Sequence, residues 1–290
     1  MKKILLATTL IAASAGFAAA EVAVTGTARM GVVALNDALG NNLGAQFSSR
    51  FRVIFTASGE TDGGLSFGAT VRNDQVGTQN RAEGDSTVYI SGAFGKLTMG
   101  DAGNVVDSLL GQVSAVGYTS LDSMNELAFL GRNVTGASYE YSAGALTFAL
   151  GAGQTQTTND YASVAVKYST DAYAVGLGYE DNTAVGSQVT LTGQASFSGA
   201  TVKVKAVDGD ASTDTRYALS VDYAINGINL TAYYADHSDA ATLTGTGTLD
   251  GQAYGIGASY DLGGGASVVG GIARNEGSDT IYDLGVKMSF

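Results

Sequence analysis

The sequence predicts an all-β protein, a 16-stranded antiparallel transmembrane β-barrel with a long third loop folded into it. Three observations indicate this fold. Apolar and polar residues alternate with a period of two, short glycine turns alternate with longer polar connections, and proline and cysteine are absent. Proline cannot donate to a strand ladder, so a chain that is nearly all paired strand has little room for it. An exported soluble protein commonly uses disulfides, which this chain cannot form.

The first 20 residues have the pattern of a secretory signal peptide. Lys2 and Lys3 precede a short apolar stretch, and three alanines at 18–20 supply the small residues of a cleavage site. The alternative, a buried N-terminal helix, fits this pattern less well. We expect residues 21–290 to form the barrel domain. Without the two lysines, 13 basic residues face 27 acidic ones, and the net charge of −14 argues against nucleic acid as a partner.

Each strand candidate has one apolar and one polar face. In the first, Val22, Val24 and Met30 share one face, and Thr27 and Arg29 share the other. The same alternation is found in segments 48–56, 65–72, 188–197, 201–207, 216–223 and 281–290.

The predicted connections alternate between short and long, as in outer-membrane barrels. Short turns rich in glycine are expected at 62–64, 94–96, 143–145, 170–171, 198–199, 226–227 and 263–265. Longer loops are expected near 34–46, 73–86, 101–137, 152–160, 181–187, 207–214, 235–251 and 274–280. Together they separate sixteen strands, which would form a barrel with a backbone diameter of about 35 Å, too wide for side chains to fill.

The positions of four arginines decide which face of the sheet points inward. A lipid-facing arginine at the bilayer midplane costs about 2–4 kcal/mol. We therefore expect Arg29, Arg50, Arg52 and Arg72 to line the lumen. Phe51, Val53 and Phe55, which alternate with two of them, would face lipid.

Segment 101–137 is too long and too apolar for a passive connection. Val105, Leu109 and Val113 are four residues apart, which predicts a short amphipathic helix that packs inside the barrel. A surface flap or a partner-binding loop is the alternative. The acids Asp107 and Asp122 would then oppose the arginines across a narrowed pore and create a transverse field. Two further acids of this loop, at positions 101 and 126, are better explained as helix caps or solvated charges.

No residue pattern predicts an enzyme. His237 is the only histidine and lies in an acidic, polar segment without the geometry of a catalytic pair. No cofactor is expected. Asp208, Asp210 and Asp214 have even spacing somewhat like a calcium loop but lack its glycine and distal glutamate. Weakly bound Ca²⁺ in such extracellular loops, or bridging to lipopolysaccharide, remains an alternative to a solvated acidic loop.

Several stretches resemble one family: SSRFRVIFTASGETDGGLSFGA, VYISGAFGKLTMGDA, VGYTSLD, YEYSAGA, YDLGGGASVVGGIARN and DLGVKMSF. They are similar to the general-diffusion porins of photosynthetic and related α-proteobacteria (the Rhodobacter type), from Glu21 to Phe290. The resemblance implies a homotrimer in the outer membrane, in contact with lipid and lipopolysaccharide. It also implies a third loop that constricts the pore, and a terminal phenylalanine read by the assembly machinery.

The resemblance further implies passive diffusion of small hydrophilic solutes and ions. It assigns the basic wall of the constriction to the four arginines and the acidic side to Asp107 and Asp122. Positions 112, 115, 120 and 123, where carboxylates are common in the family, hold Gln, Ala, Ser and Ser, so cation preference does not follow from the net charge. Two other classes stay open: a substrate-specific channel, and an exported non-channel β-protein such as an adhesin.

Overall fold

The structure is a computed structural model that describes residues 21–36, 42–77, 79–81, 86–131, 135–153, 160–210, 212–237, 251–275 and 280–290. The predicted signal peptide, residues 1–20, lies outside the described residues. Within those ranges, no helix is long and apolar enough to cross a membrane.

Sixteen long strands of the described chain form the wall of a barrel, as predicted, and β4 (Gln79–Arg81) is a short additional strand on the end of β3. The wall strands are β1 (Glu21–Asn36), β2 (Asn42–Glu60), β3 (Ser66–Val76), β5 (Ser86–Gly92), β6 (Gly95–Gly100), β7 (Gly136–Ala143), β8 (Leu146–Gly153), β9 (Tyr161–Ser169), β10 (Tyr173–Asn182), β11 (Gly186–Phe197), β12 (Ala200–Gly209), β13 (Arg216–Ile225), β14 (Ile228–Asp236), β15 (Gln252–Gly263), β16 (Ala266–Asn275) and β17 (Ile281–Ser289).

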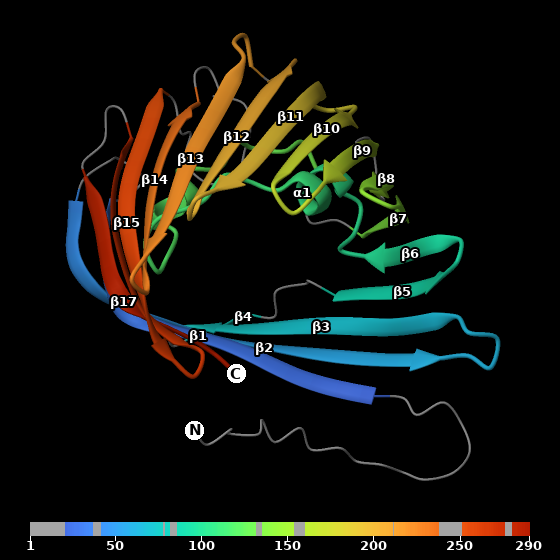
Figure 1. Cartoon of the computed structure of the whole chain (residues 1–290), viewed down its shortest axis with the longest axis horizontal. Helices are drawn as coiled ribbons and strands as arrows, with labels where there is room; N and C mark the ends of the chain where they lie inside the picture. The colour runs from blue at the N-terminus through green and yellow to red at the C-terminus, as the bar shows by residue number, and fades with distance from the viewer. Residues whose placement is uncertain are drawn as a thin grey trace.

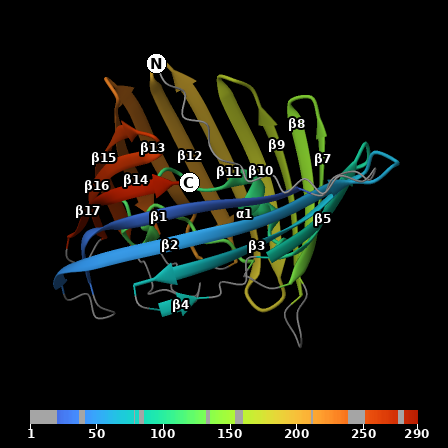
Figure 2. The same cartoon turned by 90° about the horizontal axis from the view of Figure 1, so that it is seen from below.

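The barrel is closed by its first and last strands. β1 pairs with β2 on one side and with β17 on the other, and the strand pairings of the described chain are all antiparallel around the barrel, seen along its opening in Figure 1 and from the side in Figure 2. The end of the chain completes this closure, because the backbone N–H of Phe290 donates to the Gly26 carbonyl at 2.9 Å and the Gly26 N–H donates back at 3.2 Å. A closed ring leaves no unpaired edge in the bilayer.

Three connections predicted as long loops are shorter in the structure. β1 extends to Asn36, β3 extends to Val76, and only residues 183–185 separate β10 from β11. The last of these turns is closed by Asn182, whose Oδ1 accepts the backbone N–H of Ala184 at 3.0 Å. Polar residues occupy both faces at the ends of β3 (residues 72–75) and β10 (residues 180–182), so the alternation in the sequence fades there although strand pairing continues.

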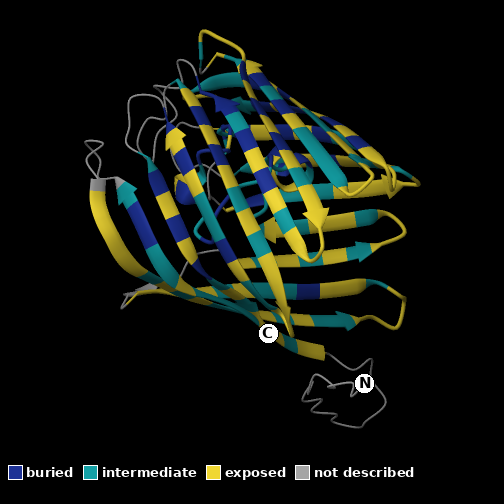
Figure 3. Ribbon diagram, turned by 60° about the vertical axis from the view of Figure 1, so that its left-hand side comes forward, coloured by how far each residue is buried: buried dark blue, intermediate teal, exposed yellow. Residues whose placement is uncertain are grey.

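β10 shows the inside-out alternation most clearly. Tyr173, Val175, Leu177 and Tyr179 point outward, each between 43% and 51% exposed, while the side chains between them are buried. Figure 3 shows the same banding along many strands of the wall. The exposed apolar face is the lipid face, as the arginine argument predicts.

The third loop, residues 101–135 between β6 and β7, folds into the barrel as predicted (Figure 1). Its helix α1 (Val105–Leu110) contacts β8, β9 and β10, and its 3₁₀ turn η1 (Leu121–Ser123) contacts β16 and β17. Asn104 caps α1 by accepting the Asp107 N–H at 3.0 Å. The helix buries Val105, Val106 and Leu110 and leaves Asp107 exposed, so the predicted amphipathic helix is confirmed.

Glycines on the inner face of the wall let the loop approach closely. A Cβ at Gly271 would lie 2.6 Å from the nitrogen of Gly117, and one at Gly178 would lie 2.7 Å from Val106 Cγ1. Glycine inside a strand often marks such a close approach. These strand glycines therefore form the seat of the third loop.

Candidate functional site

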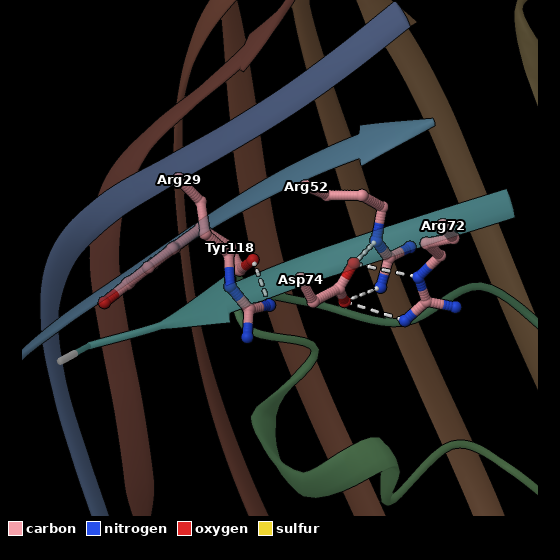
Figure 4. Close-up of polar contacts among 5 residues, drawn as sticks. All are labelled: Arg29, Arg52, Arg72, Asp74 and Tyr118. Atoms are coloured by element: carbon pink, nitrogen blue, oxygen red, sulfur yellow. Dashed lines mark hydrogen bonds and ion pairs between the residues drawn. The ribbon is translucent and has the colours of Figure 1, made fainter. Parts of the chain in front are cut away.

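The structure brings the four predicted arginines together on the inner face of β1, β2 and β3. Arg29 lies directly opposite Arg50 in the β1–β2 register. Arg52 and Arg72 lie beside them, on β2 and β3 (Figure 4). A pattern with period two explains this, because alternate residues of neighbouring strands point to one face.

Asp74 on β3 holds two of these arginines. Its Oδ1 accepts the Nε of Arg52 at 2.8 Å and the Nε of Arg72 at 2.9 Å. Its Oδ2 accepts their Nη2 groups at 2.6 and 2.7 Å (Figure 4). Two bidentate pairs on one buried carboxylate are strong, directional contacts. Asp74 was not among the predicted site residues, although Asp74 lies two residues after Arg72 and therefore points to the same face of β3.

The tip of the third loop is fastened beside the arginines. Arg29 Nη1 donates to the carbonyl of Tyr118 at 3.2 Å (Figure 4). The N–H and the hydroxyl of Thr119 both donate to Asp283 Oδ2, each at 2.7 Å. The loop tip therefore joins β1 to β17 across the inner face of the closing pair of strands.

A left-handed turn follows this tip. Residues Ser120, Leu121, Asp122 and Ser123 have φ values of 71°, 42°, 59° and 53°. Left-handed backbone costs non-glycine residues about 1–2 kcal/mol each, so the surrounding contacts must impose it. Leu121 is fully buried among wall residues, while Asp122 is exposed to the lumen.

The two predicted loop acids do not pair with the arginines. Within the described residues, both ion pairs involve Asp74. Both carboxylates are exposed on the loop surface, but the surrounding barrel partly desolvates them and so raises the pKa of Asp107 and of Asp122; for Asp107 the charge of Lys205 opposes that rise. Burial also raises the pKa of Asp101, against a lowering effect of Arg72. Asp107 and Asp122 as the acidic side of a constriction therefore stay a prediction.

Buried polar residues on the wall across from β1–β3 hold the loop, and none of them was among the predicted site residues. Lys205 on β12 is 2% exposed, and its Nζ donates to Gln112 Oε1 at 2.8 Å and to the carbonyls of Leu127 and Gly111 at 3.1 and 3.3 Å. It also lies 3.5 Å from the ring centroid of Phe129, at cation–π distance. Lys205 thereby joins the outgoing and returning arms of the loop.

His237, the first residue after β14 in the predicted loop, is part of the same anchoring. It is 3% exposed, and its Nε2 lies 2.9 Å from the carbonyl of Met124 in the third loop. Burial lowers the pKa of His237, with a further lowering effect of Arg216. Its polar neighbours in the sequence concealed this role, because the partner lies 113 positions away.

The described residues contain no group of three or more histidine, cysteine or acidic side chains that could hold a metal ion. Asp208 accepts the hydroxyl of Thr215 at 2.7 Å, and Asp210 accepts the N–H and hydroxyl of Ser187 at 2.8 and 3.0 Å. The two hydrogen bonds from Ser187 lower the pKa of Asp210.

Comparison with known proteins gives consistent matches. Residues 7–280 match the family model described as Gram-negative porin. A porin of Rhodobacter capsulatus is 40% identical, and a porin of Fuscovulum blasticum is 25% identical; both matches cover 93% of this chain and 100% of the relative. A solved porin structure is 35% identical with a TM-score of 0.76, and a mutant Rh. blastica porin, 21% identical, shares the fold with a TM-score of 0.79. Both structures cover 93% of this chain and are themselves covered completely. The chain belongs to the Gram-negative porin family.

Proposed function

We propose that the protein is a channel for passive diffusion of small hydrophilic solutes and ions, narrowed where the third loop faces the arginines of β1–β3. One observation carries this proposal: the third loop lies inside the barrel and is fastened to well-separated strands of its wall. Lys205 binds the middle of the loop on β12, and Asp283 binds its tip on β17. A loop held in this way reduces the cross-section without closing a wide barrel.

The electrostatic role of the site follows from confinement. Charges that line a narrow, low-dielectric passage act on passing ions much more strongly than the average charge of the protein does. In this proposal Arg29, Arg50, Arg52 and Arg72 form the basic side, and Asp107 and Asp122 form the acidic side. The solutes need no covalent chemistry, and the family contains channels rather than enzymes.

Planar bilayer recording tests the channel. Purified protein should produce stepwise increases in current, each step with the same conductance. A folded sample that inserts but carries no current would contradict the proposal. Competition of the ion current by added sugars, amino acids or phosphate would instead favour a substrate-specific channel.

The barrel fold and family imply an outer-membrane location. We further infer export through a cleaved peptide at residues 1–20 and assembly as a homotrimer surrounded by lipid and lipopolysaccharide. Mass spectrometry of the N-terminus of the mature protein tests the first, with Glu21 as the expected start. Electrophoresis with and without heating tests the second, since a stable trimer should migrate as one species until heated. Weak Ca²⁺ binding by the extracellular loops stays a prediction, which calorimetry with added Ca²⁺ would test.

A further inference from the structure

The arginines of the inner wall fall into two electrostatic groups. Arg52 and Arg72 share Asp74, which takes the Nε and Nη2 of both guanidinium groups at 2.6–2.9 Å. Their side chains are 23% exposed, and the Asp74 side chain is 4% exposed. Two of the three nitrogens of each guanidinium are therefore already bonded to a carboxylate.

Arg29 and Arg50 belong to a different group, which includes Lys287. The registers place Arg29 directly opposite Lys287 of β17 on one side and directly opposite Arg50 of β2 on the other. Neighbouring strands lie about 4.8 Å apart, so three cations form one row across three strands. In the part of the chain that the structure describes, none of the three has a carboxylate at ion-pair distance.

Among the described residues, the groups that face this row form no ion pair with it. Arg29 donates to a carbonyl, that of Tyr118. Asp283, four positions before Lys287 on β17, is the nearest acid on that strand; its Oδ2 accepts two hydrogen bonds from Thr119, and its charge acts on Arg29 and Lys287 from a distance. The Nε atoms of Arg29 and Arg50 are buried and have no hydrogen-bond partner.

Such a row is unfavourable for the fold. Like charges directly opposite one another destabilise a sheet, and buried donors without partners cost free energy. Departures of this kind from local rules are expected at functional sites. Unpaired cations beside an aqueous lumen are also suitable partners for a passing anion.

We propose, on the basis of the channel function above, that Lys287, Arg29 and Arg50 form the track along which small inorganic anions cross the constriction. In this proposal Asp74 sets the anion-to-cation selectivity, because it binds Arg52 and Arg72 and so keeps passing anions from binding them. The three cations of the row and the two guanidinium groups bound by Asp74 then have unequal effects on permeation. Asp74 is a specificity-determining residue because it decides how many guanidinium groups the passing anion can reach.

Reversal potentials of single variants in a KCl gradient test this. Arg50→Gln and Lys287→Gln should shift selectivity toward cations more than Arg52→Gln does, although each removes one positive charge. Asp74→Asn should raise the anion-to-cation permeability ratio up to about sixfold, because one unit charge about 8 Å away in water changes the local concentration of anions and of cations about 2.4-fold in opposite directions. The control is Glu140→Gln, which removes an exposed carboxylate from β7, several strands away from the row, and should shift the ratio less.

A double-mutant cycle gives the decisive comparison. In the Asp74→Asn background, Arg52→Gln should gain an effect as large as that of Arg50→Gln, because Arg52 is then available to anions. Equal effects of Arg50→Gln and Arg52→Gln with Asp74 present would overturn the proposal. That comparison needs no Asp74 variant and remains decisive if Asp74→Asn fails to fold. If the variants conduct but Arg50→Gln and Arg52→Gln shift the reversal potential equally, only this inference is refuted. If the unmodified protein does not conduct, the channel function itself is refuted.

Discussion

Glu180 on β10 anchors the returning arm of the third loop, and its replacement by alanine should loosen that arm. The residue is fully buried. Its Oε1 accepts the backbone N–H groups of Leu130 and Gly131 at 3.1 and 3.3 Å and the hydroxyl of Tyr161 at 2.9 Å. Its Oε2 accepts the Nε2 of Gln188 at 2.7 Å. The two loop amides therefore depend on one side chain of the wall.

The size of the effect follows from those two amides. A buried donor left without a partner costs about 1–3 kcal/mol, so Glu180→Ala should weaken the arm by about 2–6 kcal/mol. Since about 1.4 kcal/mol corresponds to a factor of ten, local opening should become roughly 30- to 20,000-fold more frequent. Penetrating water would place the result near the lower end of this range.

Hydrogen–deuterium exchange of the detergent-solubilised protein measures this opening directly. Peptides that contain Leu130 and Gly131 should exchange faster in Glu180→Ala, and single channels of the variant should show greater current noise. Glu140→Ala is the matched control, because Glu140 is an exposed glutamate on β7. Unchanged exchange at the two loop amides in a folded Glu180→Ala barrel would refute the anchoring argument.

The isosteric variant Glu180→Gln separates the hydrogen bonds from the packing. Its carbonyl oxygen can still accept the loop amides, but its NH₂ group would face the NH₂ group of Gln188. Rotating the Gln188 amide relieves that conflict only by turning its NH₂ toward Arg216 Nη2, which now donates to Gln188 Oε1 at 3.0 Å. We expect the loop amides of Glu180→Gln to exchange faster than those of the unmodified protein and more slowly than those of Glu180→Ala.

Three further predictions concern the constriction and its support. Replacing both Arg50 and Arg52 with glutamate should move selectivity toward cations, and an unchanged reversal potential would place them outside the pore. Deleting residues 104–126 should raise single-channel conductance in a barrel that still folds; an unaltered value would mean that the loop does not limit the current. Burial lowers the pKa of His237, so the folded state resists its protonation and the packing of the loop around this buried ring should lose stability as pH falls below about 6.5, although a protonated ring can still donate to the Met124 carbonyl. Loop exchange should therefore increase at acidic pH, and this dependence should be smaller in His237→Gln.

The barrel itself was predictable because lipid applies one rule to every strand. An outward arginine is costly at the midplane, and an outward phenylalanine is not. Alternation in the segment around Phe51 therefore determined which residues face the lumen without any knowledge of the partner strands. The same reasoning predicted the infolded loop, since apolar residues such as Val105 and Leu110 need a wall to pack against.

The loop anchors were not predictable in this way. Lys205 and Glu180 are inward polar residues like many others on the wall, and only the path of the third loop makes them buried partners of its backbone. The strand glycines that contact the loop are equally hard to recognise in the sequence. Nothing in the sequence distinguishes Gly271 from other small residues, and only the structure shows that Gly117 packs against it. These contacts depend on tertiary packing of an irregular segment, for which no periodic pattern exists.

The charge pairs of the constriction were predictable only in part. Which of them can be predicted depends on how the register of the two paired strands is set. In the hairpin of β2 and β3, residues equidistant from Gly63 face each other, so Arg52 faces Asp74. Because the turn at 62–64 is recognisable in the sequence, this partner could have been found by counting outward from it. No hairpin connects β1 to β17, and the pairing of Arg29 with Lys287 arises only when the barrel closes. Counting therefore finds the cations that a carboxylate neutralises, whereas the row proposed to conduct anions becomes visible only in the closed barrel.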